Sequence, residues 1–495
     1  MTNSPVIALI PLDERPVNTG LVRDVAAVAG GRLVLPPDAL LPRFREPADV
    51  DGLGRWLSGI ASGLDAAVVA VDTLVHGGLI PSRTSNDLAA SALVRLERLR
   101  ELHAAHPRVR LAAVSVVTRA SDSYSPVEEP DYWASVGREL HALGGAVHRS
   151  WAGIAGAAEP AVPPATRDDY SRRRLRNHLV GLASLGLAWD GVLDPLIITA
   201  DDTATWSAGS AEQHLLDYWQ RLRGGERVLV YPGADETGAV LTARLLLADL
   251  PRRLRVAVVP GDPAGMALVP SYENAPLELS VGRQLAALGA EAVTRAEDAD
   301  LVLVVHTPDP SRADHFAIEP PPEDPAAVEL TRRAVVVSLE SRRPVALADL
   351  RYGNGGDSAL VDALAADGTL GRLEAYAGWN TAGNALGSVL ALALAAAAGR
   401  ARGTLDEAAR ERALRRRIAD DVLFQARLRR PVSREVFGDR IEPAASEVVA
   451  RAEALLTSQL REALERILPG EPIGEVTLPW ARSFEVGIRF HGESA

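Results

Sequence analysis

The sequence contains no cysteine and no lysine, and each absence excludes a class of chemistry. Without cysteine, the chain cannot form a disulfide, a thiol nucleophile, a cysteine-ligated zinc site or an iron–sulfur cluster. Without lysine, it has no Schiff-base residue, no attachment point for pyridoxal phosphate and no phosphate-binding lysine of the Walker A type. We therefore expect no cofactor that depends on either side chain.

The chain also lacks an excess of positive charge and a long apolar run. Its formal net charge is -12, so we expect no general affinity for nucleic acid or anionic membranes. The longest apolar stretch, at 385–399, is alanine-rich and too short to span a bilayer, which favours a buried helix. The first residues have neither the basic nor the apolar segment of a signal peptide. We expect a cytoplasmic protein with no membrane partner.

Short apolar runs rich in β-branched residues alternate with longer helical stretches, a pattern typical of α/β proteins. The runs are continuously apolar, as in parallel strands that are covered on both faces. About eight of them end in a polar cluster, which is the number of units in a (β/α)8 barrel. We therefore predict a TIM-like (β/α)8 barrel with insertions over residues 1–400.

The sequence predicts more strands and helices than a minimal barrel contains, so a second architecture is also possible. Additional strands are predicted at 32–36 and 256–260, and additional helices between 131 and 187. The alternative is two doubly wound α/β domains that divide near Leu250, with the ligand in the crevice at the strand ends.

Residues 401–495 differ in character and are predicted to form a mainly helical C-terminal appendage. Amphipathic helices are expected at 405–428 and 445–468, with a loop at 429–444 between them and two short strands after Pro469. These helices could mediate the formation of a homo-oligomer.

Two acidic pairs follow predicted strands and are the candidate catalytic residues. Asp201 and Asp202 follow "LIITA", and Asp235 and Glu236 follow "YPGA". Two-carboxylate chemistry requires one protonated acid and one ionised acid close together, and glycoside hydrolysis commonly uses this arrangement. The alternative interpretation of "DDT" is a helix N-cap at Asp202 or Thr203.

Further polar side chains at strand ends are candidate substrate contacts. Arginine and carboxylate groups can bind sugar hydroxyls or a carboxylate, and an indole beside amides suits a sugar ring. Each has a structural alternative, since acids and arginines form salt bridges, a single histidine is usually structural, and tryptophan often only packs. The candidates are Asp13, Arg15, Asn18, Asp72, His76, Arg83, Arg119, Asp349, Arg351, Asn354, Asp357, Trp379, Asn380 and Asn384.

The segments "PLDERPVNT", "DTLVHGGLIPSR", "DDT", "PGADETG", "NGGD" and "YAGWNTAGN" together resemble a bacterial family known as domain of unknown function 4127. The resemblance extends from about Pro11 to Gly387 and implies that these strand ends belong to one site. That family usually has an aromatic residue where His76 stands, so the sequence departs from the family at this position.

A second resemblance concerns chemistry alone. Adjacent aspartates after a middle barrel strand resemble the site of O-GlcNAcase-type β-N-acetylhexosaminidases, in which the substrate's own acetamido group is the nucleophile. The resemblance implies that Asp201 orients the acetamido group and that Asp202 is the acid/base. A related arrangement uses an Asp-Glu pair, which Asp235 and Glu236 would fit.

The sequence therefore favours a glycosidase, most simply an exo-acting β-N-acetylhexosaminidase with a small-molecule or oligosaccharide substrate and no cofactor or metal. One alternative is a metal-dependent hydrolase or phosphate-transfer enzyme, although no HxH or HExxH spacing supports it. Another is a non-catalytic carbohydrate-binding protein. The candidate metal ligands are Asp13, Asp72, Asp201, Asp235, His306 and Asp349.

Overall fold

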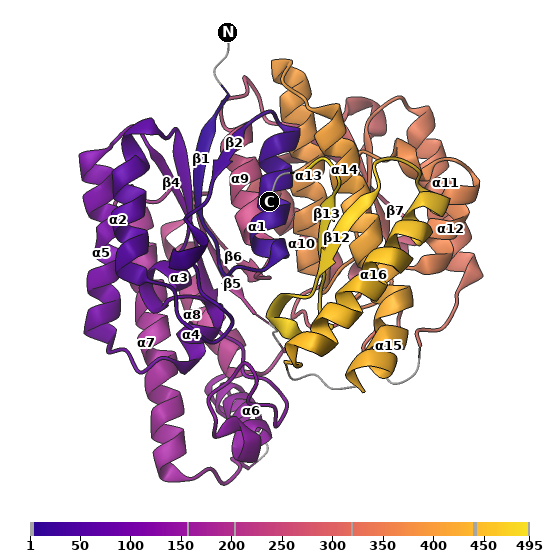
Figure 1. Ribbon diagram of the computed structural model, residues 1–495. Helices are drawn as coiled ribbons and strands as arrows, with labels where there is room; N and C mark the ends of the chain where they lie inside the picture. The colour runs from indigo at the N-terminus through magenta and orange to yellow at the C-terminus, as the bar shows by residue number, and fades with distance from the viewer. Residues whose placement is uncertain (1–3, 156–157, 202–203, 318–319, 439–442, 494–495) are drawn as a thin grey trace. The chain divides into compact units, whose positions relative to one another are not determined.

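The computed structural model describes residues 4–155, 158–201, 204–317, 320–438 and 443–493 (Figure 1). The chain divides into two compact units, and each is described by itself. The first unit comprises Met1–Glu14, Arg32–Leu241 and Tyr272–Asn274. The second comprises Arg15–Gly31, Thr242–Ser271 and Ala275–Ala495.

The first unit contains a six-stranded parallel sheet with the strand order β2-β1-β3-β4-β5-β6. The order reverses between β1 and β3, as in doubly wound folds. The strands are β1 (Val6–Ile10), β2 (Arg32–Val34), β3 (Ala66–Ala70), β4 (Arg110–Val117), β5 (Leu196–Ala200) and β6 (Val228–Pro232). The helices are α2 (Val50–Ile60), α3 (Val71–His76), α4 (Leu79–Thr84), α5 (Ala89–Ala105), α6 (Trp133–Trp151), α7 (Pro164–Trp189) and α8 (Ala208–Arg223), and α9 (Thr237–Leu247) begins in this unit.

One face of this sheet is covered by α2, α3, α5 and α7. Leucines such as Leu53 of α2 and Leu99 of α5 are buried against alternate strand residues such as Val69 and Ile198. Burying each such side chain contributes roughly 1.5–3 kcal/mol. Continuous burial along β3 and β5 explains why both strands are uniformly apolar in sequence.

The second unit contains a five-stranded parallel sheet with the strand order β11-β10-β9-β7-β8 and a two-stranded antiparallel pair, β12 and β13. The strands are β7 (Arg255–Pro260), β8 (Glu291–Val293), β9 (Leu301–His306), β10 (Val345–Asp349), β11 (Ala375–Ala377), β12 (Ile473–Thr477) and β13 (Gly487–Phe490). The helices are α1 (Pro16–Val28), α10 (Leu277–Leu288), α11 (Pro325–Glu340), α12 (Ser358–Ala366), α13 (Ala382–Arg402), α14 (Glu407–Arg417), α15 (Arg429–Val432) and α16 (Ser446–Ile467).

The apolar stretch predicted to be a buried helix is α13, which contacts β9, β10 and β11 as well as α1 and α10. Within the described residues it is the one helix long and apolar enough to cross a membrane, and 94% of its apolar window is buried inside the protein. Its alanine-rich sequence is thus explained by close packing on all sides, which is consistent with the core helix of a soluble protein.

The residues after 400 belong to the second unit and complete its other layer. Leu456, Leu460 and Leu464 of α16 are buried together with Val345 and Leu347 of β10. Between α14 and α15 the chain forms a π-helix over Ile418–Leu428. The prediction of a loop at 429–444 is wrong for the first half of this range. The chain there forms α15 and a π-helical turn, Ser433–Phe437.

The structure confirms the α/β class, the parallel strands and both short C-terminal strands. Each large sheet has the strand order of the alternative prediction, two doubly wound domains. The sheets of the described residues show no closed barrel, so the TIM-like barrel stays a prediction.

Candidate functional site

The carboxyl edge of the first sheet brings several of the predicted residues together. Val117 of β4 pairs with Ala200 of β5, so the residues after both strands emerge side by side. The amide of Asp201 accordingly donates to the carbonyl of Val117, at 3.1 Å. Asp72 is the second residue of α3, which follows β3 directly, and its Oδ2 accepts from the amide of Val116, at 2.8 Å.

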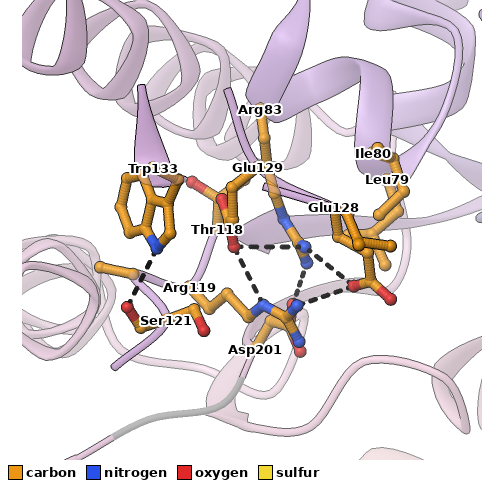
Figure 2. Close-up of polar contacts among 12 residues, drawn as sticks. Leu79, Ile80, Arg83, Thr118, Arg119, Ser121, Glu128, Glu129, Trp133 and Asp201 are labelled. Atoms are coloured by element: carbon orange, nitrogen blue, oxygen red, sulfur yellow. Dashed lines mark hydrogen bonds and ion pairs between the residues drawn. The ribbon is translucent and has the colours of Figure 1, made fainter. Parts of the chain in front are cut away.

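A buried arginine connects the carboxylates at this edge (Figure 2). Arg83, only 3% exposed at its side chain, pairs with Asp201, and its Nη1 lies 3.4 Å from Glu128 Oε2 and 3.7 Å from Glu129 Oε1. Arg119 contacts the same two glutamates, with Nη2 2.7 Å from Glu128 Oε2 and Nε 3.2 Å from Glu129 Oε1. Two guanidinium groups thus balance most of the charge of three carboxylates, which makes this cluster a charge-compensated network.

Asp72 and His76 are both buried in α3 and are held near neutrality for the same physical reason. Burial raises the pKa of the Asp72 carboxyl to about 7, against the opposing effects of the Val116 amide and of Arg83. Burial, assisted by Arg176 and Arg95, lowers the pKa of the His76 imidazole to about 3. Neither ring nitrogen of His76 has a hydrogen-bond partner among the described residues. His76 is therefore a neutral, packed side chain.

The other acids predicted for this edge differ in what they contact. Glu236 is fully buried after β6, where its Oε2 accepts from the amide of Ala234, at 3.0 Å, and so holds its own turn. Asp235 is buried beside it, and Asp13 is buried after β1. Asp202, the predicted acid/base, lies outside the described residues.

The carboxyl edge of the second sheet carries a different constellation. Asp349 ends β10 and pairs in register with His306, the last residue of β9. Its Oδ2 accepts from the Tyr376 hydroxyl, at 2.8 Å, and from the Asp357 amide, at 2.7 Å. Asp349 Oδ1 is buried and has no hydrogen-bond partner among the described residues. Burial raises the pKa of the Asp349 carboxyl, so that it favours the protonated form.

Asp357 has the opposite tendency, although it lies on the same loop. Burial alone would raise its pKa, but a hydrogen bond and the charge of His306, together with amides of α12, lower it. His306 Nε2 lies 3.2 Å from Asp357 Oδ2, and its Nδ1 lies 2.7 Å from the Thr331 hydroxyl. Neighbouring carboxyl groups whose environments move their pKa values apart are typical of acid/base sites.

A pocket opens beside Asp349. Its interior is small, with a cavity volume of about 20 Å³, and the empty space reaches about 370 Å³ only when the open solvent at its mouth is counted. Asp309, Asp349, Arg351, Asn380 and Thr381 are among its polar lining residues, and Ala382 and Ala385 of α13 give it an apolar wall. Carboxylates, amides and hydroxyls around a small apolar surface suit a polyhydroxylated ligand.

The remaining predicted residues of the second unit have mainly structural contacts. Arg351 Nη2 pairs with Asp324, at 2.6 Å, and Asn354 donates from Nδ2 to both Asp314 oxygens. Trp379 is buried, with its ring 6.0 Å from that of Phe484, which corrects the expected stacking platform because packed atoms cover the indole. Asn384 is buried in the first turn of α13.

Arg15 and Asn18, which flank the start of α1, also belong to the second unit. The Arg15 guanidinium lies 4.5 Å from the centre of the Trp480 ring, and its Nη1 is 3.3 Å from Glu485 Oε1. The salt-bridge alternative therefore holds for Arg15. Asn18 is buried within α1.

The sequence did not indicate several residues that contribute to the two sheet edges. Glu128 and Glu129 lie in a loop, where an acidic pair before proline was the only signal. Asp309 follows β9 and could have been found as a strand-end acid. Asp421 comes from the π-helix, and its Oδ2 accepts from the amide of Gly378, at 2.8 Å, at the pocket wall. Nothing in the amphipathic pattern around Asp421 indicates this contact.

The geometry gives no support to the metal-site alternative within the described residues. Among the described residues, no three or more His, Asp or Glu side chains lie close enough together to hold a metal ion. Of the acids predicted as ligands, Asp72 accepts from a backbone amide, Asp201 pairs with Arg83, and Asp349 accepts from an amide and a tyrosine hydroxyl.

Comparison with known proteins gives a family but no activity. The family model described as "Protein of unknown function (DUF4127)" matches residues 7–489. No curated protein matches the chain. Among solved structures, the apo form of the dinucleotide-forming acetyl-coenzyme A synthetase 1 of Ca. Korarchaeum cryptofilum is 12% identical, with 82% of this chain and 98% of that chain covered at a TM-score of 0.16. A similarity this low carries no argument about fold or function.

Proposed function

The chain belongs to the DUF4127 family, whose description names no activity, and we propose that it is a glycoside hydrolase with Asp349 as the general acid. A general acid must hold its proton at the working pH and present it to the leaving oxygen. The observation that carries the proposal is Asp349 itself, a buried carboxyl with a raised pKa at the wall of a pocket, whose Oδ1 has no hydrogen-bond partner in the part of the chain that the structure describes.

The surroundings of Asp349 favour the protonated form for a physical reason. Packing is so close that a Cβ on Gly378 would lie 3.0 Å from the Tyr376 hydroxyl oxygen and 3.2 Å from the carbonyl oxygen of Asp349. Water therefore has no room on that side, and the ionised carboxylate would lose its hydration. The Tyr376 hydroxyl and the Asp357 amide both bond to Oδ2, which leaves Oδ1 to carry the proton.

A second carboxylate lines the same pocket. Asp309 accepts from the amide of Ser311, at 3.0 Å, and from its hydroxyl, at 2.6 Å. In the proposed reaction Asp349 protonates the glycosidic oxygen, while Asp309 stabilises the positive charge that develops on the sugar ring. Asn380 and Thr381, which also line the pocket, would bind sugar hydroxyls.

We propose an N-acetylhexosaminide as the substrate class to test first. In the substrate-assisted route the acetamido oxygen is the nucleophile, so the protein must supply one proton donor and one carboxylate that orients the acetamido group. Asp349 and Asp309 can fill these roles, as can Asp201 and Asp202, which the sequence favours. Asp201 is paired with Arg83, and an ionised, paired acid is a better orienting group than proton donor.

The test is a set of aspartate-to-asparagine variants assayed on nitrophenyl glycosides, with β-N-acetylglucosaminide and β-N-acetylgalactosaminide in the panel. Asparagine at position 349 keeps an oxygen that can accept hydrogen bonds from the Tyr376 hydroxyl and the Asp357 amide. It is not an acid and cannot protonate the leaving oxygen. We expect Asp349→Asn to lower kcat/KM by about 10²- to 10⁴-fold, the usual contribution of a general acid. The matched control is Asp362→Asn, an exposed acid that pairs with Arg427.

The pH profile adds an independent readout. Because the acid must be protonated and its pKa is raised, activity should fall as pH rises through the Asp349 pKa. The Asp309→Asn variant should lose activity without losing this alkaline limb. Full activity of Asp349→Asn, or hydrolysis of no glycoside by the folded wild type, would refute the proposal. Loss of activity in Asp201→Asn or Asp202→Asn with unchanged Asp349→Asn would move the chemistry to the first unit.

A further inference from the structure

The outward face of α8 in the first unit is an apolar stripe. Leu215, Tyr218, Trp219 and Leu222 are 39%, 57%, 41% and 66% exposed. Their spacing of three, one and three residues puts all four side chains on one side of the helix. The opposite side, with Gln213, Leu216 and Gln220, is buried, so the helix is fixed to its unit by the other face.

The stripe is larger than scattered surface leucines would give. An aromatic side chain has a surface of about 150–250 Å². From their exposed fractions, Tyr218 and Trp219 therefore each expose about 100 Å². On the neighbouring helix α6, Val147 and Trp151 are 44% and 59% exposed. Together the six side chains expose about 600 Å² on two helices that contact each other, at the upper end of the apolar patches that monomers expose.

Helices α6 and α8 contact each other through aromatic rings. The ring of His148 in α6 lies 5.3 Å from that of His214 in α8 and 4.9 Å from that of Trp206. Tyr218 and Trp219 contact each other edge to face, with ring centres 5.3 Å apart. An aromatic pair that is already ordered loses little side-chain entropy on association, which is typical of interface hot spots.

We propose that this patch, defined by Val147, Trp151, Leu215, Tyr218, Trp219 and Leu222, binds a second copy of the same chain. The stripe reads the same in both directions, because two leucines flank an aromatic pair at equal spacing. Two antiparallel α8 helices related by a two-fold axis between positions 218 and 219 would place Leu215 against Leu222 of the other copy. Tyr218 would then meet Trp219 of the other copy, the self-complementary contact that a two-fold interface requires.

Area and charge also agree with a copy of this chain. A stable interface buries about 800 Å² per partner, so the patch supplies most of its apolar centre. The chain carries a net charge of -12, which would oppose self-association elsewhere. Helix α8 itself has two acids, Glu212 and Asp217, and two arginines, Arg221 and Arg223, so its local charge is balanced. Asp217 and Arg221 pair at 2.6 Å beside the stripe and would form a polar rim.

The first test is the oligomeric state of the full-length protein by sedimentation or light scattering. We expect a dimer for the wild type, and a monomer for Tyr218→Glu and Leu222→Glu at the same concentration, because a charge would be buried at the centre of the contact. Val94→Glu is the control, since Val94 is 70% exposed on α5 and is also apolar. Melting temperatures should match the wild type at low concentration, which separates lost association from misfolding.

The second test fixes the orientation and uses the absence of cysteine in the chain. Two single-cysteine variants, Leu215→Cys and Leu222→Cys, are oxidised separately and as a mixture. The antiparallel arrangement predicts that the mixture forms a mixed disulfide dimer more efficiently than either variant alone. Val94→Cys should form no such dimer in any mixture.

Three outcomes would overturn the proposal. The first is a wild type that sediments as a monomer up to about 100 μM. The second is a dimer that survives Tyr218→Glu and Leu222→Glu, which would place the contact elsewhere, such as on the C-terminal helices. Cross-linking of the mixture no better than that of Val94→Cys would exclude the antiparallel α8 contact.

Discussion

At the carboxyl edge of the first sheet Asp201 meets a buried guanidinium, whereas at the corresponding edge of the second sheet Asp349 meets a tyrosine hydroxyl and a backbone amide. Both acids follow a uniformly buried strand, and the two local sequences are similar in kind. Pairing with Arg83 favours the charged form of Asp201, while burial raises the pKa of Asp349 against the opposing effect of His306. The group that contacts the acid at the strand end therefore determines whether the acid is a charged member of a salt-bridge network or favours its protonated form.

The largest effect on stability is expected from removing the cation of the first edge. Arg83→Met keeps most of the side-chain volume but leaves Asp201, Glu128 and Glu129 with Arg119 alone. Breaking a buried pair by removing one partner typically costs about 3–5 kcal/mol, and we expect a loss near the lower figure because the carboxylates are partly exposed. Denaturant unfolding measures the change.

The control for Arg83 is an arginine whose ion pairs are exposed. Arg100 is 43% exposed and pairs with Glu97 and Asp190, so Arg100→Met should cost much less than Arg83→Met. Equal losses in the two variants would mean that the network contributes no more than an ordinary surface pair, and the contrast between the two sheet edges would fail.

The next effect depends on pH and concerns Asp72, the acid of the first edge that most resembles Asp349. Its pKa is about 7 in the folded chain against an ordinary value of 3.8, so the unfolded state releases its proton more readily. Stability should therefore fall as pH rises from about 4 to about 7 and change little above that. Asp72→Asn keeps the acceptor for the Val116 amide and should abolish this fall.

Comparison of melting temperatures at pH 4.5 and pH 8 tests Asp72. The melting temperature of Asp72→Asn should be higher than that of the wild type at pH 8. At pH 4.5 most of this difference should disappear. Asp51→Asn is the opposite control, because a hydrogen bond from Arg98 lowers the pKa of Asp51 and the variant should lose rather than gain at pH 8. An Asp72→Asn difference that does not change with pH would show that Asp72 is ionised and solvated.

The strand ends themselves were predictable from the sequence, because an uninterrupted apolar run must stop where the chain becomes polar. The ranges around Leu196–Ala200, Leu301–His306 and Val345–Asp349 were found in this way. Which strand lies beside which could not be found, since eight similar runs fit a barrel or two open sheets equally well. Pairing depends on contacts between residues far apart in the chain, and local composition does not record them.

The same limit applies to the sites. Asp201 and Asp349 were chosen correctly as strand-end acids, but their partners could not be predicted. Arg83 lies 118 positions before Asp201, and Asp421 reaches the pocket wall only because the helix after α14 widens into a π-helix. The sequence offered a division near Leu250 only as an alternative, and it gave no sign that Arg15–Gly31 belongs to the second unit.

The smallest effect is expected at His76, which the sequence offered as a substrate contact and which the structure buries without hydrogen-bond partners for its ring among the described residues. Its pKa of about 3 lies below the ordinary 6.5, so only the unfolded state takes up a proton between these values. Stability therefore falls as pH decreases from about 6.5 towards 3, and at pH 5 the loss is about 2 kcal/mol.

His76→Phe should remove that loss, because a phenyl ring fills similar space and cannot be protonated. We expect the variant to be within about 1 kcal/mol of the wild type at pH 7.5, where the imidazole is neutral in both states, and to be the more stable protein at pH 5. Thermal unfolding at the two pH values measures the difference. If the variant lost glycosidase activity while its pH-dependent stability stayed like that of the wild type, His76 would contact substrate, and the uncharged, purely packed role derived from its burial would be wrong.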